Sequence, residues 1–369
     1  MELKPFRIEQ YYGLYEFTAE FMLSSSDAET VAVSDLLALE PGAEAALFEQ
    51  RLGYTESPGA PALREAISAI YETVASDDVL VVSAAEEGIF AAYHALLRPG
   101  DHVVVETPCY ESALELARST GAEVTEWRRR NADGWAHDLD ELERVLRPDT
   151  SLVYVNTPHN PTGTSMPRAV LDRLVELCAE RHAWLFCDEV YRELEHDPSD
   201  RLPAACDLYE RAISLGSMSK TYGLPGLRLG WLASRDRDAL ARVLEFKYYT
   251  TICSSAPSEL LSEIAIRHRD VLAERNRAIV LGNLPLLDAF FERHAGRFNW
   301  VRPTASPIGF PKVEGVADVT AFCRRLVDET GVLLLPGTVY DEPEHVRFGY
   351  GRANMPEALA RLETWLDTG

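Results

Sequence analysis

The residues best suited to chemistry lie in one stretch near the middle of the chain, residues 217–230, which reads SMSKTYGLPGLRLG. In this stretch Ser217, Ser219 and Arg228 can each hydrogen-bond an anion, and an arginine does so through two parallel bonds. Lys220 stands among these donors, and the chain has only four lysines. A Schiff-base enzyme needs such an arrangement, because the amine holds an aldehyde cofactor and the donors hold its phosphate. A surface lysine in a Ser/Gly loop is the alternative interpretation.

Two further polar groups follow apolar runs that are typical of buried strands. Asp188 comes directly after the run at 183–187, and Asn160 follows the run at 152–155 by a few residues. Because open α/β sheets bind ligands at the carboxyl ends of their strands, we expect these side chains to lie near Lys220. A carboxylate paired with a pyridine nitrogen would keep that nitrogen protonated, so that the ring could accept electrons from a substrate Cα. The alternative for Asp188 is a helix N-cap.

A third feature is the start of a helix after the apolar run at 79–82. The sequence SAAEEG at 83–88 opens a helix that we expect to continue through Leu97. A phosphate at this helix N-terminus would meet free backbone amides and a favourable dipole. We therefore predict that the amides of Ala85 and Glu86 bind the cofactor.

Together these features resemble a known family. The stretch 217–230 resembles the signature of the class I/II aminotransferases, which are fold-type I enzymes that use pyridoxal 5'-phosphate (PLP), and the tetrad NPTG at 160–163 is similar to another of their motifs. The resemblance implies that PLP is the cofactor and that it forms a Schiff base with Lys220. The pattern that begins at Tyr54 also resembles the family, in which this tyrosine reaches the cofactor phosphate of the neighbouring subunit. A homodimer with shared active sites is therefore implied.

The resemblance also implies roles for residues around the cofactor ring. Tyr110 would stack on the ring, while Asn160 and Tyr191 would bond its phenolic oxygen from opposite sides. The family's arginine that binds the substrate α-carboxylate matches Arg347, and Arg352 is the nearby alternative. Asn160 is also expected to contact the substrate.

Residues 1–40 resemble the family least. In class I enzymes this segment crosses the mouth of the active site, where Glu9 and Asp27 would face the substrate and favour a cationic side chain such as a guanidinium. The alternative is an amphipathic segment with solvated acids. An acid, several aromatic residues and the serine triplet at 24–26 are also similar to the N-terminus of capreomycidine synthase-like PLP cyclases, which act on hydroxylated arginine.

The order of the expected elements predicts the fold. Strands alternate with helices across 75–235, which indicates an α/β protein with a mainly parallel sheet covered by helices on both faces. The family resemblance implies seven strands and a smaller α/β domain. We expect an N-terminal segment at 1–40 that joins the small domain and covers the site, a large PLP-binding domain at 41–250, and a small domain at 251–369. A long helical region at 255–295, broken near Pro285, would connect the two domains.

The predicted function is a PLP-dependent aminotransferase, in which Lys220 moves the substrate Cα proton and a 2-oxo acid finally accepts the amino group. The alternative is a PLP-dependent cyclase or lyase that acts on a hydroxylated, arginine-like substrate, because the pocket selects which bond breaks. A ligand-sensing domain of a regulator is disfavoured, since no helix-turn-helix segment or basic patch is evident.

Composition bounds the partners and the location. The formal net charge of −23 disfavours nucleic acid and anionic membranes as partners. The sequence contains no run of eighteen apolar residues, so we expect no membrane span, and no signal peptide is evident. Six scattered cysteines without a C-x-x-C pair suit a reducing cytoplasm and argue against a structural zinc site, so no metal is expected.

Overall fold

The computed structural model describes residues 2–368, and its centre is a seven-stranded sheet. Six strands run in one direction, and β7 alone is antiparallel to both of its neighbours. The prediction of a mainly parallel, seven-stranded sheet is confirmed. In spatial order the strands are β1 (Val79–Val82), β7 (Gly230–Ala233), β6 (Ala212–Ser217), β5 (Trp184–Asp188), β4 (Thr150–Asn156), β2 (His102–Thr107) and β3 (Glu123–Arg128).

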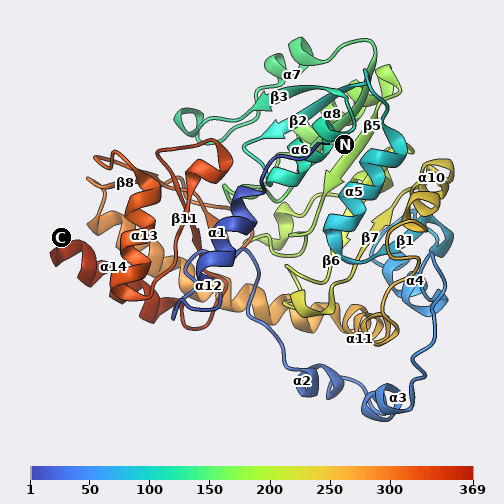
Figure 1. Ribbon diagram of the computed structural model, residues 1–369, viewed down its shortest axis with the longest axis horizontal. Helices are drawn as coiled ribbons and strands as arrows, with labels where there is room; N and C mark the ends of the chain where they lie inside the picture. Colours follow the sequence, from blue (N-terminus) through green and yellow to red (C-terminus); the bar gives the residue numbers. More distant parts are fainter. Residues whose placement is uncertain (1, 369) are drawn as a thin grey trace.

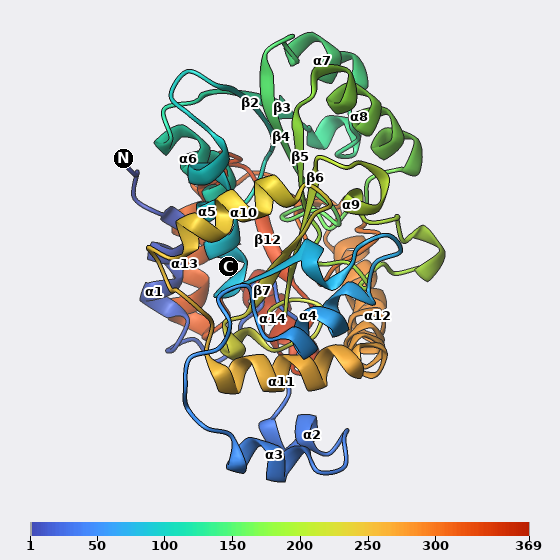
Figure 2. The ribbon, with the colours of Figure 1, turned by 90° about the vertical axis from the view of Figure 1, so that its right-hand side faces the viewer.

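Helices cover both faces of this sheet, as Figure 2 shows. The strands β1, β2 and β6 are buried along their whole length, as expected for a sheet that is covered on both faces. One face carries α5 (Ala84–Leu96), α6 (Glu111–Ser119) and α10 (Arg237–Lys247). The opposite face carries α7 (Leu139–Val145) and α8 (Arg168–Arg181).

The C-terminal part forms its own hydrophobic cluster, which is rich in aromatic rings. Its small sheets pair β10 with β8, and β11 and β9 with β12. The N-terminal helix α1 (Arg7–Tyr15) packs on this cluster through Ile8 and Tyr11 (Figure 1). The elements of this part are α12 (Arg269–Arg293), β8 (Phe298–Asn299), β9 (Ile308–Gly309), β10 (Lys312–Val313), α13 (Val319–Thr330), β11 (Leu335–Pro336), β12 (Val346–Gly349) and α14 (Met355–Thr368).

The long helical region is interrupted, but not at the predicted place. α11 (Ala256–Arg267) ends at His268, whose backbone leaves the helical conformation, and α12 then continues through Pro285 without a break. A proline inside a helix removes a single backbone donor. Buried side chains of α12 on both sides of Pro285, such as Leu284 and Leu287, anchor the helix to the C-terminal cluster and offset this loss.

Two short helices pack against α11 at the edge of the molecule. Figures 1 and 2 show α2 (Val33–Leu37) and α3 (Ala43–Glu49) on an extended arm beneath α11, after which the chain returns to α4 (Pro61–Ser68). This arm and the chain after it carry exposed apolar side chains, among them Phe48 and Tyr54. Within residues 2–368, no helix combines the length and the apolar character needed to cross a bilayer.

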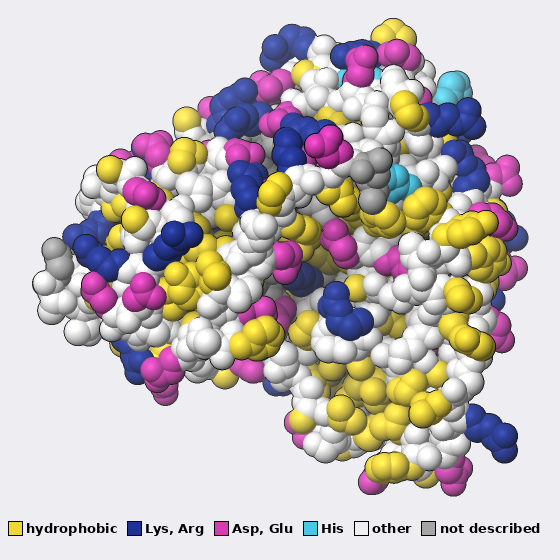
Figure 3. Space-filling view, in the orientation of Figure 1, with side chains coloured by type: hydrophobic (Ala, Val, Ile, Leu, Met, Phe, Trp, Pro, Cys, Tyr) yellow, Lys and Arg dark blue, Asp and Glu magenta, His cyan; other side chains and the backbone are white. Residues whose placement is uncertain are grey.

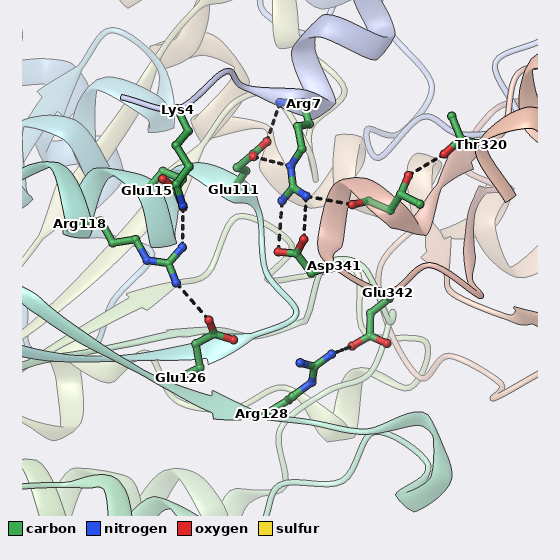
Figure 4. A network of polar contacts seen from close by, with 11 residues as sticks. Lys4, Arg7, Glu111, Glu115, Arg118, Glu126, Arg128, Thr320, Asp341 and Glu342 are labelled. Atoms are coloured by element: carbon green, nitrogen blue, oxygen red, sulfur yellow. Dashed lines mark hydrogen bonds and ion pairs between the residues drawn. The ribbon is translucent and has the colours of Figure 1, made fainter. Parts of the chain in front are cut away.

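A network of ion pairs holds the N-terminal segment between the two parts of the chain (Figure 4). The backbone and the guanidinium of Arg7 donate to the Glu111 carboxylate of α6, at 2.7 and 2.8 Å. The same guanidinium donates to Asp341, at 2.7 and 3.2 Å, and so lowers the pKa of that carboxyl. Arg7 therefore joins α1 to the sheet domain and to the C-terminal part at once.

Candidate active site

A cavity of about 610 Å³ opens where the carboxyl ends of β4, β5 and β6 meet the start of α5, the N-terminal segment and β12. In Figure 3 the molecular surface is hollowed near its centre, and charged side chains of both signs gather there. Every predicted site residue except Tyr54 lines this cavity: Glu9, Asp27, Ala85, Glu86, Tyr110, Asn160, Asp188, Tyr191, Ser217, Ser219, Lys220, Arg228 and Arg347.

Lys220 lies three residues beyond the end of β6, and its amine points into the cavity. The Nζ atom donates a hydrogen bond of 2.8 Å to the Ser26 hydroxyl, which the N-terminal segment supplies. Burial lowers the pKa of Lys220, while the nearby carboxylates of Asp27 and Asp188 oppose this shift. A lowered pKa raises the fraction of neutral amine, and the neutral amine is the form that attacks a carbonyl carbon or accepts a proton.

Asp188 is the last residue of β5 and is buried. Its carboxylate accepts a hydrogen bond from the Tyr154 hydroxyl at 3.0 Å and from the Val190 backbone at 3.2 Å. Burial raises the pKa of Asp188 to about 6, although both hydrogen bonds oppose the rise. A carboxylate that is costly to ionise in a closed site is stabilised by a cationic partner, and a protonated pyridine nitrogen is such a partner.

Donors for an anion lie beyond the end of β6 and at the start of α5. Ser217 and Ser219 are linked through their hydroxyls at 3.1 Å, and Arg228 has no carboxylate partner within the described part of the chain. α5 begins beside them with no side chain capping its first amides. Ala84, the first residue of α5, has φ of 72°, the left-handed conformation that glycine adopts most easily.

The two acids in the first turn of α5 do not both point at these donors. The Glu87 carboxylate turns back to the Ser83 backbone amide at 2.5 Å and accepts the hydroxyls of Thr250 and Thr251 at 2.5 and 2.7 Å. Backbone packing is close here, because a Cβ on Gly230 would lie only 2.9 Å from the Ala85 nitrogen. The start of α5 is thus held against β7, and its amides remain available to an anion.

Arg347 lies on β12 and is almost fully buried, and no carboxylate among residues 2–368 forms an ion pair with it. Its guanidinium donates to the Ser24 carbonyl at 2.9 Å, to the Tyr12 hydroxyl at 2.6 Å and to the Asn160 side-chain oxygen at 3.1 Å. It also donates to the Tyr340 hydroxyl. A buried charge without a counter-ion is costly, so this arginine is poised to bind an anion that enters the cavity.

The alternative arginine is already paired. Arg352 donates to the Asp27 carboxylate at 2.7 Å, so these two charges balance each other at the cavity edge. Arg347 is therefore the better candidate for the carboxylate site.

Two of the predicted tyrosines also lie at the cavity. Tyr110 lies in the cavity wall, and its hydroxyl donates to Glu9 at 2.7 Å. Tyr191 is buried near Asp188.

Some residues of the site were missed by the sequence analysis, and one predicted residue lies elsewhere. Tyr12, Ser26, Tyr154 and Tyr340 contact the central charged groups. Ser26 belongs to the serine triplet noted in the sequence, but nothing in the local sequence of the three tyrosines distinguishes them from other tyrosines. Tyr54 is 92% exposed and does not reach the cavity of its own chain. This exposure does not test the prediction that Tyr54 completes the site of a neighbouring subunit.

The family model for aminotransferase class I and II matches residues 23–362. The chain belongs to this family. The capreomycidine synthase of Streptomyces vinaceus is 32% identical over 356 residues, which cover 95% of this chain and 91% of that protein. The structure of a PLP-dependent aminotransferase from Streptococcus suis 89-1591 covers 100% of this chain and 99% of its own, at 30% identity and a TM-score of 0.94. The PLP-dependent cyclase OrfR covers 100% and 98%, at 29% identity and a TM-score of 0.92.

The cofactor of this class I/II enzyme is therefore PLP, and the residues present fit it. In this cavity the amine of Lys220 would hold the aldehyde, the Asp188 carboxylate would pair with the pyridine nitrogen, and the donors that include Arg228 would hold the phosphate. Asn160 and Tyr191, which line the same cavity, would bond the phenolic oxygen, and Tyr110 would offer an aromatic face. When bound, PLP supplies an electron sink for the bonds at the substrate Cα.

Proposed function

We propose that this enzyme is an aminotransferase that exchanges the amino group of an L-amino acid with the keto group of a 2-oxo acid. One observation carries the proposal. The guanidinium of Arg347 is buried in the wall of the cavity that also holds the Lys220 amine, and no carboxylate of residues 2–368 forms an ion pair with it. An α-carboxylate bound there, through two parallel hydrogen bonds, places the adjoining Cα inside the cavity that Lys220 enters.

Each charged residue then has a task. Arg347 and Asn160 fix the α-carboxylate. The amine of Lys220 takes the proton from the substrate Cα and delivers it to the cofactor carbon that is bonded to the substrate nitrogen. Ser26, hydrogen-bonded to that amine, keeps it pointed into the cavity. Asp188, held by Tyr154, retains a proton on the pyridine nitrogen. These tasks match the requirements of proton transfer at a carbon atom, which needs a close, correctly protonated base.

Cyclisation or elimination on an arginine-like substrate is the second candidate. Its support is the similarity over 95% of the chain to capreomycidine synthase, together with the acids of the N-terminal segment at the cavity wall. The same proton removal at Cα begins this reaction, but a leaving group at Cβ then departs and the amino group is not transferred to the cofactor.

A homodimer is part of the proposal. The exposed apolar side chains of the arm, Phe48 at 80% and Tyr54 at 92% exposure, suit burial against a second copy. Tyr54 would then donate to the partner's cofactor phosphate. A cytoplasmic location and the division of the chain at residues 40 and 250 stay predictions.

One experiment tests the function and separates its two forms. The PLP-loaded enzyme is mixed with single L-amino acids, and the cofactor absorbance is followed while the products are identified by mass. Conversion of PLP to pyridoxamine phosphate with release of a 2-oxo acid supports transamination. Loss of ammonia or water, with the cofactor returned as PLP, supports elimination or cyclisation. An unchanged cofactor spectrum with all amino acids would refute both.

A further inference from the structure

Asn156 joins two residues of the site through its side chain. It is the last residue of β4 and is buried in the wall of the cavity. Its side-chain amide donates to the backbone carbonyl of Asp188 at 2.8 Å, and its side-chain oxygen accepts the backbone amide of Asn160 at 2.7 Å. Asn156 and Asp188 stand opposite each other at the last register position of β4 and β5. One side chain therefore connects the end of β5 with the loop that carries Asn160.

The side chain of Asn160 is itself oriented by two donors. Its oxygen accepts from the Arg347 guanidinium and from the Tyr340 hydroxyl, both at 3.1 Å. Among residues 2–368 no group accepts a hydrogen bond from the side-chain amide of Asn160. This amide is thus the part of Asn160 that remains for an acceptor in the cavity, such as the phenolic oxygen of PLP.

A buried charged pair holds Asn156 from the other side. The backbone pairing of β2 with β4 extends to Val105 and Tyr154, so the Asn156 amide lies beyond this ladder. There the Glu106 carboxylate takes the place of a backbone carbonyl and accepts the Asn156 amide at 3.0 Å. The other oxygen of Glu106 accepts from Arg129 at 3.2 Å, and both side chains are almost completely buried. Neither lines the cavity, so the pair acts on the site only through the residues that it holds.

Arg129 also holds the far end of the loop that carries Asn160. It lies directly after β3 and donates to the Thr164 hydroxyl at 2.5 Å. Its partner Glu106 holds Asn156 at the start of the same loop. The loop is therefore fixed at both ends by one buried ion pair. A buried polar network with its hydrogen bonds made is a rigid support for the groups attached to it.

We propose that Asn156 is a positioning residue for the cofactor, because it sets the spacing between Asp188, which takes the pyridine nitrogen, and Asn160, which takes the phenolic oxygen. These two atoms belong to one rigid ring, so the groups that bind them must keep a fixed separation to bind both at once. Asn156 contacts the backbone of both residues, and the Glu106–Arg129 pair holds Asn156 itself. The inference concerns the hold on the cofactor, so it goes beyond the proposed function and does not depend on which reaction follows.

The test compares PLP with two analogues, each of which lacks one of the two ring contacts. Deoxy-PLP has no phenolic oxygen, and deaza-PLP has a carbon atom in place of the ring nitrogen, while both keep the aldehyde and the phosphate. Dissociation constants of all three for the full chain, freed of cofactor, are measured by fluorescence titration without substrate. We expect the wild-type protein to bind PLP roughly 10- to 100-fold more tightly than either analogue, since each analogue loses one hydrogen bond that involves charge.

Asn156→Ala should reduce both preferences. The affinity ratios of PLP to deoxy-PLP and of PLP to deaza-PLP should each fall by roughly threefold to tenfold, because the two ring contacts no longer form together. A general loss of structure would instead weaken all three ligands by the same factor and leave the ratios unchanged. Asn156→Ser keeps a polar group in this buried place but is too short to bridge both partners. It should change the ratios in the same direction, and it decides the question if the alanine variant does not fold.

Asn283→Ala is the matched control. Asn283 is also buried, and its side-chain amide donates to the carbonyls of Tyr350 and Arg352, both at 2.9 Å, but it does not line the cavity. This variant should keep both wild-type ratios.

Three results would overturn the inference. They are equal affinity of the wild-type protein for PLP and its analogues, wild-type ratios in the Asn156 variants, and an equal fall of the ratios in the Asn283 control. Because no substrate is present, these results are distinct from failure of the proposed function, in which no amino acid alters the spectrum of the loaded enzyme.

Discussion

Replacing Asp188 by asparagine should make the cofactor-free protein more stable and the loaded enzyme nearly inactive. The side chains have almost the same size, and an asparagine oxygen can still accept from Tyr154 or from the Val190 amide. What changes is the charge. The buried carboxylate destabilises the fold until a cation meets it, and the neutral amide does not.

The size of the effect follows from the raised pKa. Burial moves the pKa of Asp188 from 3.8 to about 6. Because the folded pKa lies above the unfolded one, ionisation opposes folding, and the cost is fully present above pH 6 and absent below pH 4. Two pKa units correspond to about 3 kcal/mol at pH 8, and linkage reduces this to roughly half at pH 5.

The assay is chemical unfolding of the cofactor-free wild-type and Asp188→Asn proteins at pH 8 and pH 5. We expect the variant to gain about 3 kcal/mol at pH 8 and about half of that at pH 5. With PLP bound, Cα proton removal should slow by roughly 10²–10⁴-fold, since the ring loses the carboxylate that keeps its nitrogen protonated.

A matched variant sharpens the interpretation. Tyr154→Phe removes a donor to the carboxylate but keeps the charge, so it should raise the pKa of Asp188 further and destabilise the cofactor-free protein at pH 8. If wild type and Asp188→Asn instead unfold with the same dependence on pH, Asp188 is not a strained carboxylate and the assignment of its partner is wrong.

Four other substitutions test the remaining assignments. Lys220→Ala should abolish turnover, and borohydride reduction should no longer attach the cofactor covalently to the chain. If peptide mapping of the reduced wild-type enzyme finds the cofactor on the buried Lys247, the assignment is wrong. Tyr54→Phe should weaken PLP retention by about 1.5–3 kcal/mol, and mixing it with Lys220→Ala should give heterodimers with one intact site; equal PLP retention would argue against sharing. Arg347→Lys should raise KM for amino acids roughly 10- to 100-fold while PLP binding persists, which a substrate titration measures. Arg7→Ala should raise KM and make the chain before residue 20 more sensitive to proteases, whereas an unchanged digestion pattern would show that the anchor is dispensable.

The sheet and its ligand-binding edge were predictable because local sequence determines them. Apolar runs such as 152–155 and 212–215 are buried wherever they lie in an α/β fold, and Asp188 follows such a run directly. The strand β7 was harder to see. It is only four residues long and follows the turn after Arg228, and its antiparallel register with β6 makes residues 218–229 the connection between the two strands.

The contacts that complete the site could not be predicted, because they join residues far apart in sequence. Tyr12 and Ser24 meet Arg347 across more than three hundred positions. The chain has fifteen tyrosines, and their local sequence does not show which of them turns inward. Likewise, Pro285 suggested a helix break, but tertiary packing on both sides of it keeps α12 continuous.

The contact between the Ser24 carbonyl and Arg347 also determines the order in which a newly synthesised chain can form its cofactor site and its substrate carboxylate site. All proposed cofactor contacts within one chain, from Ala85 to Arg228, leave the ribosome more than a hundred residues before Arg347. Because proteins tend to fold from the N-terminus during synthesis, a nascent chain can capture PLP while its carboxylate site does not yet exist. Ser24 and Tyr12 are synthesised early, but their contacts with Arg347 can form only after β12 has been synthesised. Substrate recognition is therefore the final property that the polypeptide gains, after the cofactor has had the opportunity to stabilise the sheet around it.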